Sequence, residues 1–223
     1  MRTDPKINLH LGCSLQAMRE MKDNQYDLAI VDPPYGINAG LKTSYGSRNI
    51  NYKIQKYTKK NWDMNIPSKK YFDELMRVSK NQIIFGANYF TMYLPPKKGW
   101  IVWDKMIGDN HFSMHELIFT SMKIVPKIIS ISIEKNRVSN NRDIAKNKQR
   151  IHPTQKPIAL YKWLLENYTK EGDKILDTHL GSGSIACACY DLGFDLDAWE
   201  IDTEYFEKTS KRFQEHSKQS KLF

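Results

Sequence analysis

Short apolar runs alternate along the chain with segments that have helical spacing, and this alternation predicts most of the secondary structure. Strands are expected at residues 6–10, 27–31, 82–85, 100–103, 116–120, 174–177 and 196–200. Helices are expected at 14–21, where a serine provides the cap, and at 68–79, 157–168, 184–192 and 203–216. Because strands and helices alternate, the pattern predicts an α/β fold with a doubly wound, mostly parallel sheet.

Two polar stretches interrupt this pattern, at residues 36–61 and 134–150. Both are rich in basic residues and are interpreted as loop insertions in a single domain that spans 1–223. The basic residues in them that are candidates for contact with a polyanion are Lys42, Arg48, Lys53, Lys56, Lys59, Lys60, Arg137, Arg142 and Lys148. A run of lysines is often only a solvated face, but two such loops beside one site also fit phosphate neutralisation.

Composition narrows the class of protein. A chain of 223 residues, 40% hydrophobic, is large enough for one α/β core. It has no apolar run near the roughly 18–20 residues that span a bilayer, so we expect a soluble, cytoplasmic protein with no membrane partner.

Its three cysteines lack Cys-x-x-Cys spacing and are interpreted as buried thiols. The net charge of +9 favours a polyanionic partner, of which nucleic acid is the commonest.

The segment 177–186 has the form of a cofactor loop between a strand and a helix. Its glycines, Gly181 and Gly183, allow a tight turn and close approach of a ligand to the backbone. Glu200 ends the next expected strand, at the spacing from which a carboxylate accepts ribose hydroxyls. The same pattern satisfies the loose Gly-x-Gly-x-x-Ala form, so a nicotinamide dehydrogenase and a simple turn are alternatives.

A second constellation, Asp32-Pro33-Pro34-Tyr35, follows the buried strand at 27–31. An aromatic exocyclic amine is a poor nucleophile because its lone pair is delocalised into the ring. A carboxylate from Asp32 and the Pro33 carbonyl, each accepting one amine hydrogen, would favour a pyramidal nitrogen. The two prolines stiffen the backbone, and Tyr35 offers a flat face to an extruded base. The alternative is a proline-stiffened turn with a solvated Asp32.

Together these motifs resemble the amino-specific DNA methyltransferases of the permuted β group. In that family the Asp-Pro-Pro-Tyr motif comes early and the glycine-rich loop comes late, which is the order found here. The string 152–157, His-Pro-Thr-Gln-Lys-Pro, matches the family's His-Pro-x-x-Lys-Pro segment, and residues 82–90 resemble the strand after the catalytic motif. The resemblance implies a Rossmann-like class I methyltransferase fold with a circularly permuted motif order.

The resemblance also implies the reaction and its residues. Methyl transfer from S-adenosylmethionine to the N6 amine of a flipped-out adenine would leave S-adenosylhomocysteine and need no metal. The catalytic residues would be Asp32, Pro33, Pro34 and Tyr35. The cofactor-binding residues would be Asp177, Gly181, Ser182, Gly183, Glu200, His152, Lys156 and Pro157, with Pro153 beside them.

Two positions depart from the family pattern. His179 stands where the family often has Phe, and Cys13 stands where an Asp commonly reaches the cofactor's adenine amine, so that contact must come from elsewhere. His111 and His115 lie beside Glu116 but lack the His-Glu-x-x-His order, so no metal site is expected there.

Three alternatives of function stay open. One is methylation of the N4 amine of cytosine, although family members of that kind more often begin the motif with Ser. Another is a non-catalytic DNA-binding protein that has kept the fold, and the dehydrogenase ranks last because it leaves Asp32 unexplained. Double-stranded DNA is the expected partner, and the pattern is compatible with a homodimer and with a cognate restriction endonuclease.

Overall fold

The computed structural model describes residues 4–41, 44–45, 55–56, 58–107, 114–133 and 150–220. Its strands are β1 (Ile7–Leu11), β2 (Tyr26–Val31), β3 (Ser44–Tyr45), β4 (Gln55–Lys56), β5 (Ser79–Phe85), β6 (Trp100–Asp104), β7 (His115–Thr120), β8 (Lys127–Ser130), β9 (Lys174–Asp177) and β10 (Asp195–Glu200). Its α-helices are α1 (Ser14–Glu20), α2 (Lys69–Val78), α3 (Ile158–Tyr168), α4 (Ser184–Leu192) and α5 (Thr203–Ser220). Two 3₁₀ turns, η1 (Ala39–Leu41) and η2 (Ala87–Tyr89), complete the described elements.

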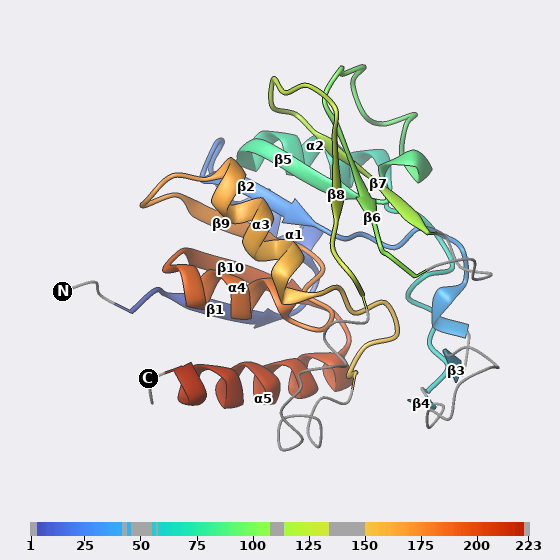
Figure 1. Ribbon diagram of the computed structural model, residues 1–223, viewed down its shortest axis with the longest axis vertical. Coiled ribbons are helices and arrows are strands. Elements are labelled where there is room, and N and C mark those ends of the chain that lie inside the picture. Colours follow the sequence, from blue (N-terminus) through green and yellow to red (C-terminus); the bar gives the residue numbers. More distant parts are fainter. Residues whose placement is uncertain are drawn as a thin grey trace.

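Eight strands form one sheet in the order β1-β10-β9-β2-β5-β7-β6-β8 (Figure 1). The five strands from β1 to β5 in this order pair in parallel, whereas β7 runs antiparallel to both of its neighbours. The expected mostly parallel α/β sheet is therefore confirmed. The central strand β2 is buried along nearly its whole length, as the apolar run Leu-Ala-Ile-Val in it predicts.

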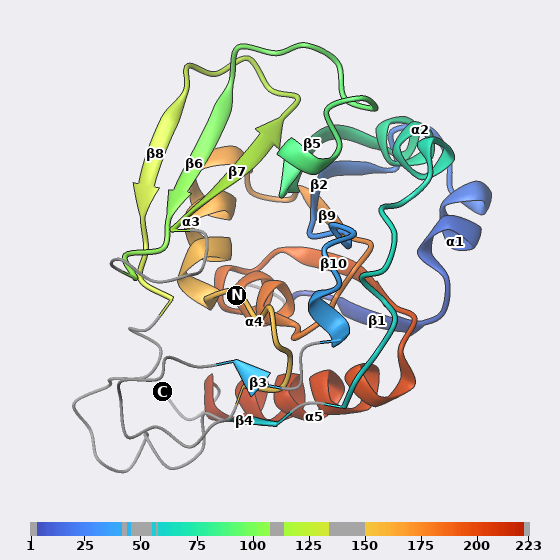
Figure 2. The ribbon, with the colours of Figure 1, turned by 90° about the vertical axis from the view of Figure 1, so that its right-hand side faces the viewer.

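Helices cover both faces of the sheet, which gives three layers (Figure 2). On one face α1 packs on α2, and their apolar side chains, including Met18 and Phe72, meet β2 and β5. On the other face α3 packs on α4, which also contacts α5, and Leu164 and Ile185 join the second core. Burial on both faces explains why the central strands read as continuous apolar runs rather than alternating ones.

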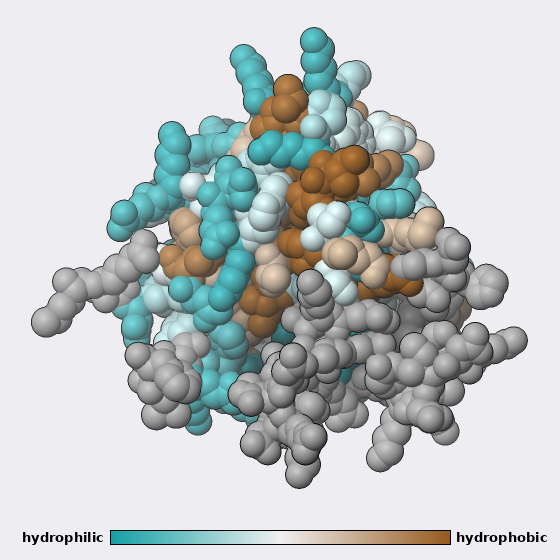
Figure 3. Space-filling model, viewed as in Figure 1, coloured by the Kyte–Doolittle hydropathy of each residue, from teal (hydrophilic) through white to brown (hydrophobic). Residues whose placement is uncertain are grey.

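Several expected elements differ at their boundaries or were missed. The cap of α1 is Cys13, without a side-chain hydrogen bond, so the expected serine cap is wrong. Helix α5 continues past residue 216 to Ser220, because its polar end contains no helix-breaking residue. Strand β8 was not expected from the sequence, because its segment is short and exposes Ile128. Among the described strands it pairs with β6 alone. Apolar side chains gather on this part of the surface (Figure 3).

The parallel strands bring three candidate site residues to one edge of the sheet. Asp32 follows β2, Asp177 ends β9, and Glu200 ends β10, all at carboxyl ends of adjacent strands. Ligands of open α/β sheets bind at this edge, where the strand connections diverge. The stretch 36–61 holds η1 and the antiparallel pair β3–β4, and residues 134–149 lie outside the described part of the chain.

Cys187 and Cys189 are buried, as expected, while Cys13 is half-buried. Across the described ranges, no helix is both long enough and apolar enough to cross a membrane.

Candidate active site

The turn after β2 is held by a buried carboxylate from elsewhere in the chain. Asp63, 2% exposed, accepts hydrogen bonds from the backbone N–H groups of Tyr35 (2.6 Å), Gly36 (2.9 Å) and Ala39 (2.8 Å). Three donors on one carboxylate fix the path of the chain immediately after the two prolines. Asp63 was not singled out from the sequence, because no local motif announces a contact that spans 24 to 28 residues.

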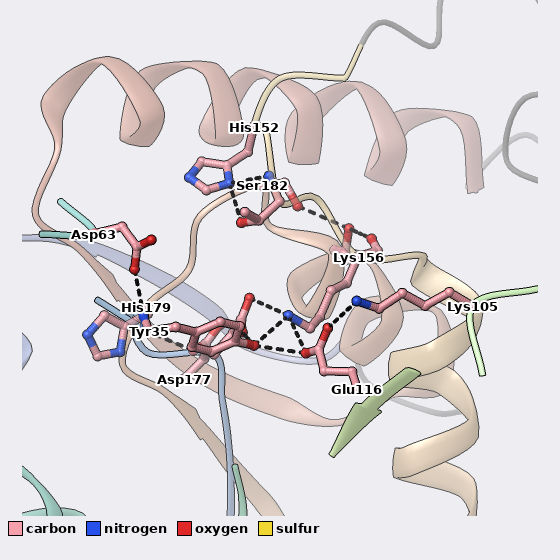
Figure 4. A network of polar contacts seen from close by, with 12 residues as sticks. Tyr35, Asp63, Lys105, Glu116, His152, Lys156, Asp177, His179 and Ser182 are labelled. Carbon is pink, nitrogen blue, oxygen red and sulfur yellow. Dashed lines mark hydrogen bonds and ion pairs between the residues drawn. The ribbon is translucent and has the colours of Figure 1, made fainter. Parts of the chain in front are cut away.

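Tyr35, Glu116, Lys156 and Lys105 lie together in a compact cluster (Figure 4), and Asp32 belongs to it through its contacts. One of its oxygens, Oδ1, accepts the Tyr35 hydroxyl at 2.6 Å, and the other, Oδ2, lies 2.6 Å from the Lys156 ammonium. Glu116, on β7, lies 3.1 Å from Lys156 and 2.8 Å from the Tyr35 hydroxyl. Lys105 completes the cluster at 3.0 Å from Glu116. Two carboxylates and the Lys156 ammonium thus contact one phenol, and Lys105 pairs with one of the carboxylates.

Burial and charge act in opposite directions in this cluster. Burial raises the pKa of Asp32, against the opposing effect of the Lys156 ammonium. Burial also acts to raise the pKa of Glu116, but Lys156 and Lys105 outweigh it and bring that pKa to about 2. Burial and the two carboxylates raise the pKa of Tyr35, so its hydroxyl keeps its proton. Glu116 is therefore the firmly ionised carboxylate of the pair.

The Tyr35 ring is packed against two other aromatic rings and the backbone at Gly86. It stacks on Tyr89 with ring centroids 5.1 Å apart and an interplanar angle of 11°, and Phe90 meets it edge-on at 6.0 Å. Gly86 has a φ of +60°, and a Cβ at that position would overlap the Tyr35 ring. A glycine is therefore required there on both counts.

The loop after β9 is tied to the end of β10. Gly181, with a φ of +51°, donates its N–H to Glu200 at 2.9 Å, and the other Glu200 oxygen accepts the N–H of Asp202 at 2.9 Å. Asp177 accepts the N–H of His179 at 3.0 Å, and burial raises the pKa of Asp177 to about 8. These contacts hold the loop in the sharp turn that its glycines predict.

A cavity of about 230 Å³ lies between this loop and the turn after β2. Its walls come from five segments, represented by Cys13, Pro34, Ile66, His179 and Glu200. The remaining lining residues are Gly12, Ser14, Leu15, Asn65, Pro67, Ser68, Tyr71, Thr178, Trp199 and Ile201. Sequence patterns did not single out 65–68 or Trp199, which reach the cavity only through the folded chain.

Of the eight residues expected to bind a cofactor, Glu200 lines this cavity directly. Asp177 and Gly181 lie one hydrogen bond behind its wall. Gly183 lies against Thr209 and begins α4 as its cap.

The other expected residues lie deeper, on the α3 side. His152 packs between Trp62 and Tyr205, with ring centroids at 5.1 and 4.4 Å. The Ser184 hydroxyl bonds both Ser182 and the Lys156 carbonyl, and Pro157 caps α3. The ammonium of Lys156 points into the Asp32 cluster instead of the cavity.

Of the basic residues expected to contact DNA, Lys59 and Lys60 have described side chains. Lys59 is exposed, but Lys60 lies 2.7 Å from Asp202 and 2.8 Å from Glu204, so its charge is already paired. Only the backbone of Lys56 is described, and the expected positions Lys42, Arg48, Lys53, Arg137, Arg142 and Lys148 lie outside the described residues.

His111 also lies outside the described residues. Within the described part of the chain, no group of three or more His, Cys, Asp or Glu side chains could hold a metal ion.

The fold is that of the class I, Rossmann-like methyltransferases. A family model described as DNA methylase (N6_N4_Mtase) matches residues 95–212, more than half of the chain, and the chain belongs to this N6/N4 DNA methylase family. The expected resemblance is thereby confirmed.

Individual relatives extend the similarity over most of the chain. It is 28% identical to the type II methyltransferase M.HpaI of Haemophilus parainfluenzae, over 92% of this chain and 74% of that protein. It is 25% identical to the type II methyltransferase M2.MboI of Moraxella bovis, over 95% of this chain and 89% of that protein.

Solved structures share the fold at low sequence identity. The M1.HpyAVI–SAM complex superposes with a TM-score of 0.58 at 17% identity, over 92% of this chain and 98% of that chain. The cytosine-N4-specific PvuII DNA methyltransferase superposes with a TM-score of 0.61 at 12% identity, over 97% of this chain and 93% of that chain. These neighbours confirm the expected fold class.

Proposed function

We propose that this chain is a site-specific DNA methyltransferase that moves a methyl group from S-adenosylmethionine to the exocyclic N6 amine of adenine. The observation that carries the proposal is the position of Asp32-Pro33-Pro34-Tyr35, which follows β2 at the carboxyl edge of the sheet and contributes Pro34 to the wall of the cavity. The relatives named as type II methyltransferases support it.

The described cavity has the chemistry that a nucleoside with an attached amino acid requires. Its apolar wall, which includes Leu15, Ile66 and Trp199, suits a purine face, and the Glu200 carboxylate suits the ribose hydroxyls. Cys13 and Ser14 line the cavity where the family often has an Asp, so we assign the adenine edge to this segment. When bound, S-adenosylmethionine supplies a methyl group attached to a positively charged sulfur.

The catalytic turn acts by orienting the target amine. Asp32 and the Pro33 carbonyl each accept a hydrogen from the target amine, which turns the nitrogen lone pair toward its reaction partner. Stacking of the extruded base is assigned to the Tyr35 ring, which itself stacks on Tyr89. The amine loses its surplus proton to solvent afterwards, so Asp32 acts as an acceptor of hydrogen bonds and need not remove the proton first.

Adenine is favoured over cytosine because the motif begins with Asp, whereas family members that act on cytosine more often begin it with Ser. The fold neighbour from the PvuII system is cytosine-N4-specific, and the N4 amine of cytosine offers the same two hydrogens. That second candidate is tested by identifying the methylated base.

DNA is the proposed partner, with its phosphates held by the basic residues of 36–61 and 134–150. Lys59, which is exposed, is the member of this set whose described side chain is best placed to do so.

The test compares wild-type protein with Asp32→Ala in transfer of a tritiated methyl group to double-stranded DNA. We expect Asp32→Ala to lose transfer while calorimetry shows near wild-type affinity for S-adenosylmethionine. Asp73→Ala is the matched control, because Asp73 is 56% exposed in an ion pair with Lys69 on the outer surface of α2. Full transfer by Asp32→Ala would refute the assignment.

A further inference from the structure

Glu116 reaches the catalytic turn from a part of the fold that carries no sequence motif of the reaction. It lies on β7, the antiparallel strand between β5 and β6, 81 residues from Tyr35 along the chain. Its side chain is 10% exposed, and its two oxygens contact Lys105, Lys156 and the Tyr35 hydroxyl (Figure 4). The role of this carboxylate is not explained by cofactor binding, since it does not line the cavity.

The Tyr35 hydroxyl has more hydrogen-bond acceptors within reach than it has protons to donate. A phenol has one proton, yet the hydroxyl lies 2.6 Å from Asp32 Oδ1 and 2.8 Å from Glu116 Oε1. Lys156 approaches the same oxygen at 3.3 Å as a donor. The hydroxyl can therefore donate to either carboxylate by rotating its O–H bond, without any movement of the ring.

This choice matters because both Asp32 oxygens already have a donor. Tyr35 bonds Oδ1 and Lys156 bonds Oδ2, so a target amine hydrogen that approaches Oδ1 competes with the Tyr35 hydroxyl for that oxygen. Lys156 bonds Glu116 as well as Asp32, so its ammonium can stay in place. Tyr35 is the donor that can turn away, provided that a second acceptor receives its proton.

We infer that Glu116 is a positioning residue for methyl transfer: it accepts the Tyr35 hydroxyl when the target amine takes over the bond to Asp32 Oδ1. Lys105, 3.0 Å from the other Glu116 oxygen, holds the carboxylate in place for this exchange. Without Glu116, a Tyr35 hydroxyl that leaves Asp32 would have no acceptor for its proton. The inference rests on the proposed function, because it concerns the amine that Asp32 receives.

The experiment measures kcat and the KM for S-adenosylmethionine in Glu116→Ala, Glu116→Gln, Tyr35→Phe and the double variant Tyr35→Phe/Glu116→Ala. We expect Glu116→Ala to lower kcat by about 10- to 100-fold with little change in this KM. Glu116→Gln keeps a carbonyl oxygen as acceptor and should lose less. In the Tyr35→Phe background, which has no hydroxyl to place, Glu116→Ala should change kcat by less than about threefold.

The control is Glu74→Ala, which removes a partly exposed carboxylate from the Arg77 ion pair on α2. An equal loss from Glu116→Ala with and without the Tyr35 hydroxyl would overturn the inference, and so would wild-type kcat in Glu116→Ala. In either case methyl transfer by the wild type and its loss in Asp32→Ala would leave the proposed function standing. Absence of transfer by the wild type would instead overturn both.

Discussion

Replacement of Asp63 by Ala tests how the catalytic turn is held. The change removes a buried carboxylate that accepts three backbone N–H groups, from Tyr35, Gly36 and Ala39. A buried donor left without a partner costs roughly 1–3 kcal/mol, and such losses within one network are not additive. We therefore expect the free energy of unfolding to fall by about 3–5 kcal/mol, which is less than the full sum of three such losses.

The assay is urea unfolding with linear extrapolation, supported by thermal unfolding. A loss of 3 kcal/mol corresponds to a fall of roughly 6–12 °C in the midpoint for a chain of this size. Asp63→Asn should fall between Ala and wild type, because its one oxygen can serve Tyr35 and Gly36 but its amide nitrogen cannot accept from Ala39. The control Asp73→Ala should cost under about 1 kcal/mol. Equal stability of the Asp63→Ala and Asp73→Ala proteins would refute the reasoning.

Two further predictions concern pH and salt. Burial lowers the pKa of His152 to about 3, so below about pH 6.5 the unfolded chain binds a proton on this imidazole that the folded chain does not bind. The contribution of His152 to stability therefore falls as pH falls below about 6.5. Between about pH 8 and 5 this amounts to about 2 kcal/mol, and urea unfolding of His152→Gln should show a loss smaller by that amount. An unchanged pH dependence would contradict this prediction. For DNA binding, Lys59→Ala should reduce the slope of log K against log salt by about one. Lys60→Ala should change that slope less, because Asp202 and Glu204 already pair its ammonium. Equal slopes for the two variants would contradict this and would indicate that Lys60 contacts DNA as Lys59 does.

The parts of the site that the sequence predicts are those built from neighbouring residues. The apolar run in β2 ends at Asp32 and two prolines, and the glycines 181 and 183 lie between β9 and α4, so each turn could be placed from local pattern alone. The parallel sheet then brings both turns to one edge. These expectations needed only a parallel sheet and the rule that ligands bind at the carboxyl ends of its strands.

The parts that could not be predicted depend on contacts between distant segments. Glu116 meets Tyr35 because β7 pairs antiparallel with β5, a register that no short window of sequence contains. Asp63 follows the basic stretch 36–61, whose sequence predicts a loop, yet it bonds the turn after β2. Lys156 was grouped with the cofactor residues because of its place in the His152 to Pro157 string, yet its ammonium contacts Asp32. Direction of a long side chain is set by charge partners in the fold, which a motif does not specify.

Mass analysis of nucleosides from DNA treated with this protein and S-adenosylmethionine tests the central claim most directly. The account predicts N6-methyladenine from the wild type, and none when Asp32→Ala replaces it. Methylated cytosine in its place would move the proposal to the N4 amine. Unmodified nucleosides from a wild-type protein that binds S-adenosylmethionine would contradict the account.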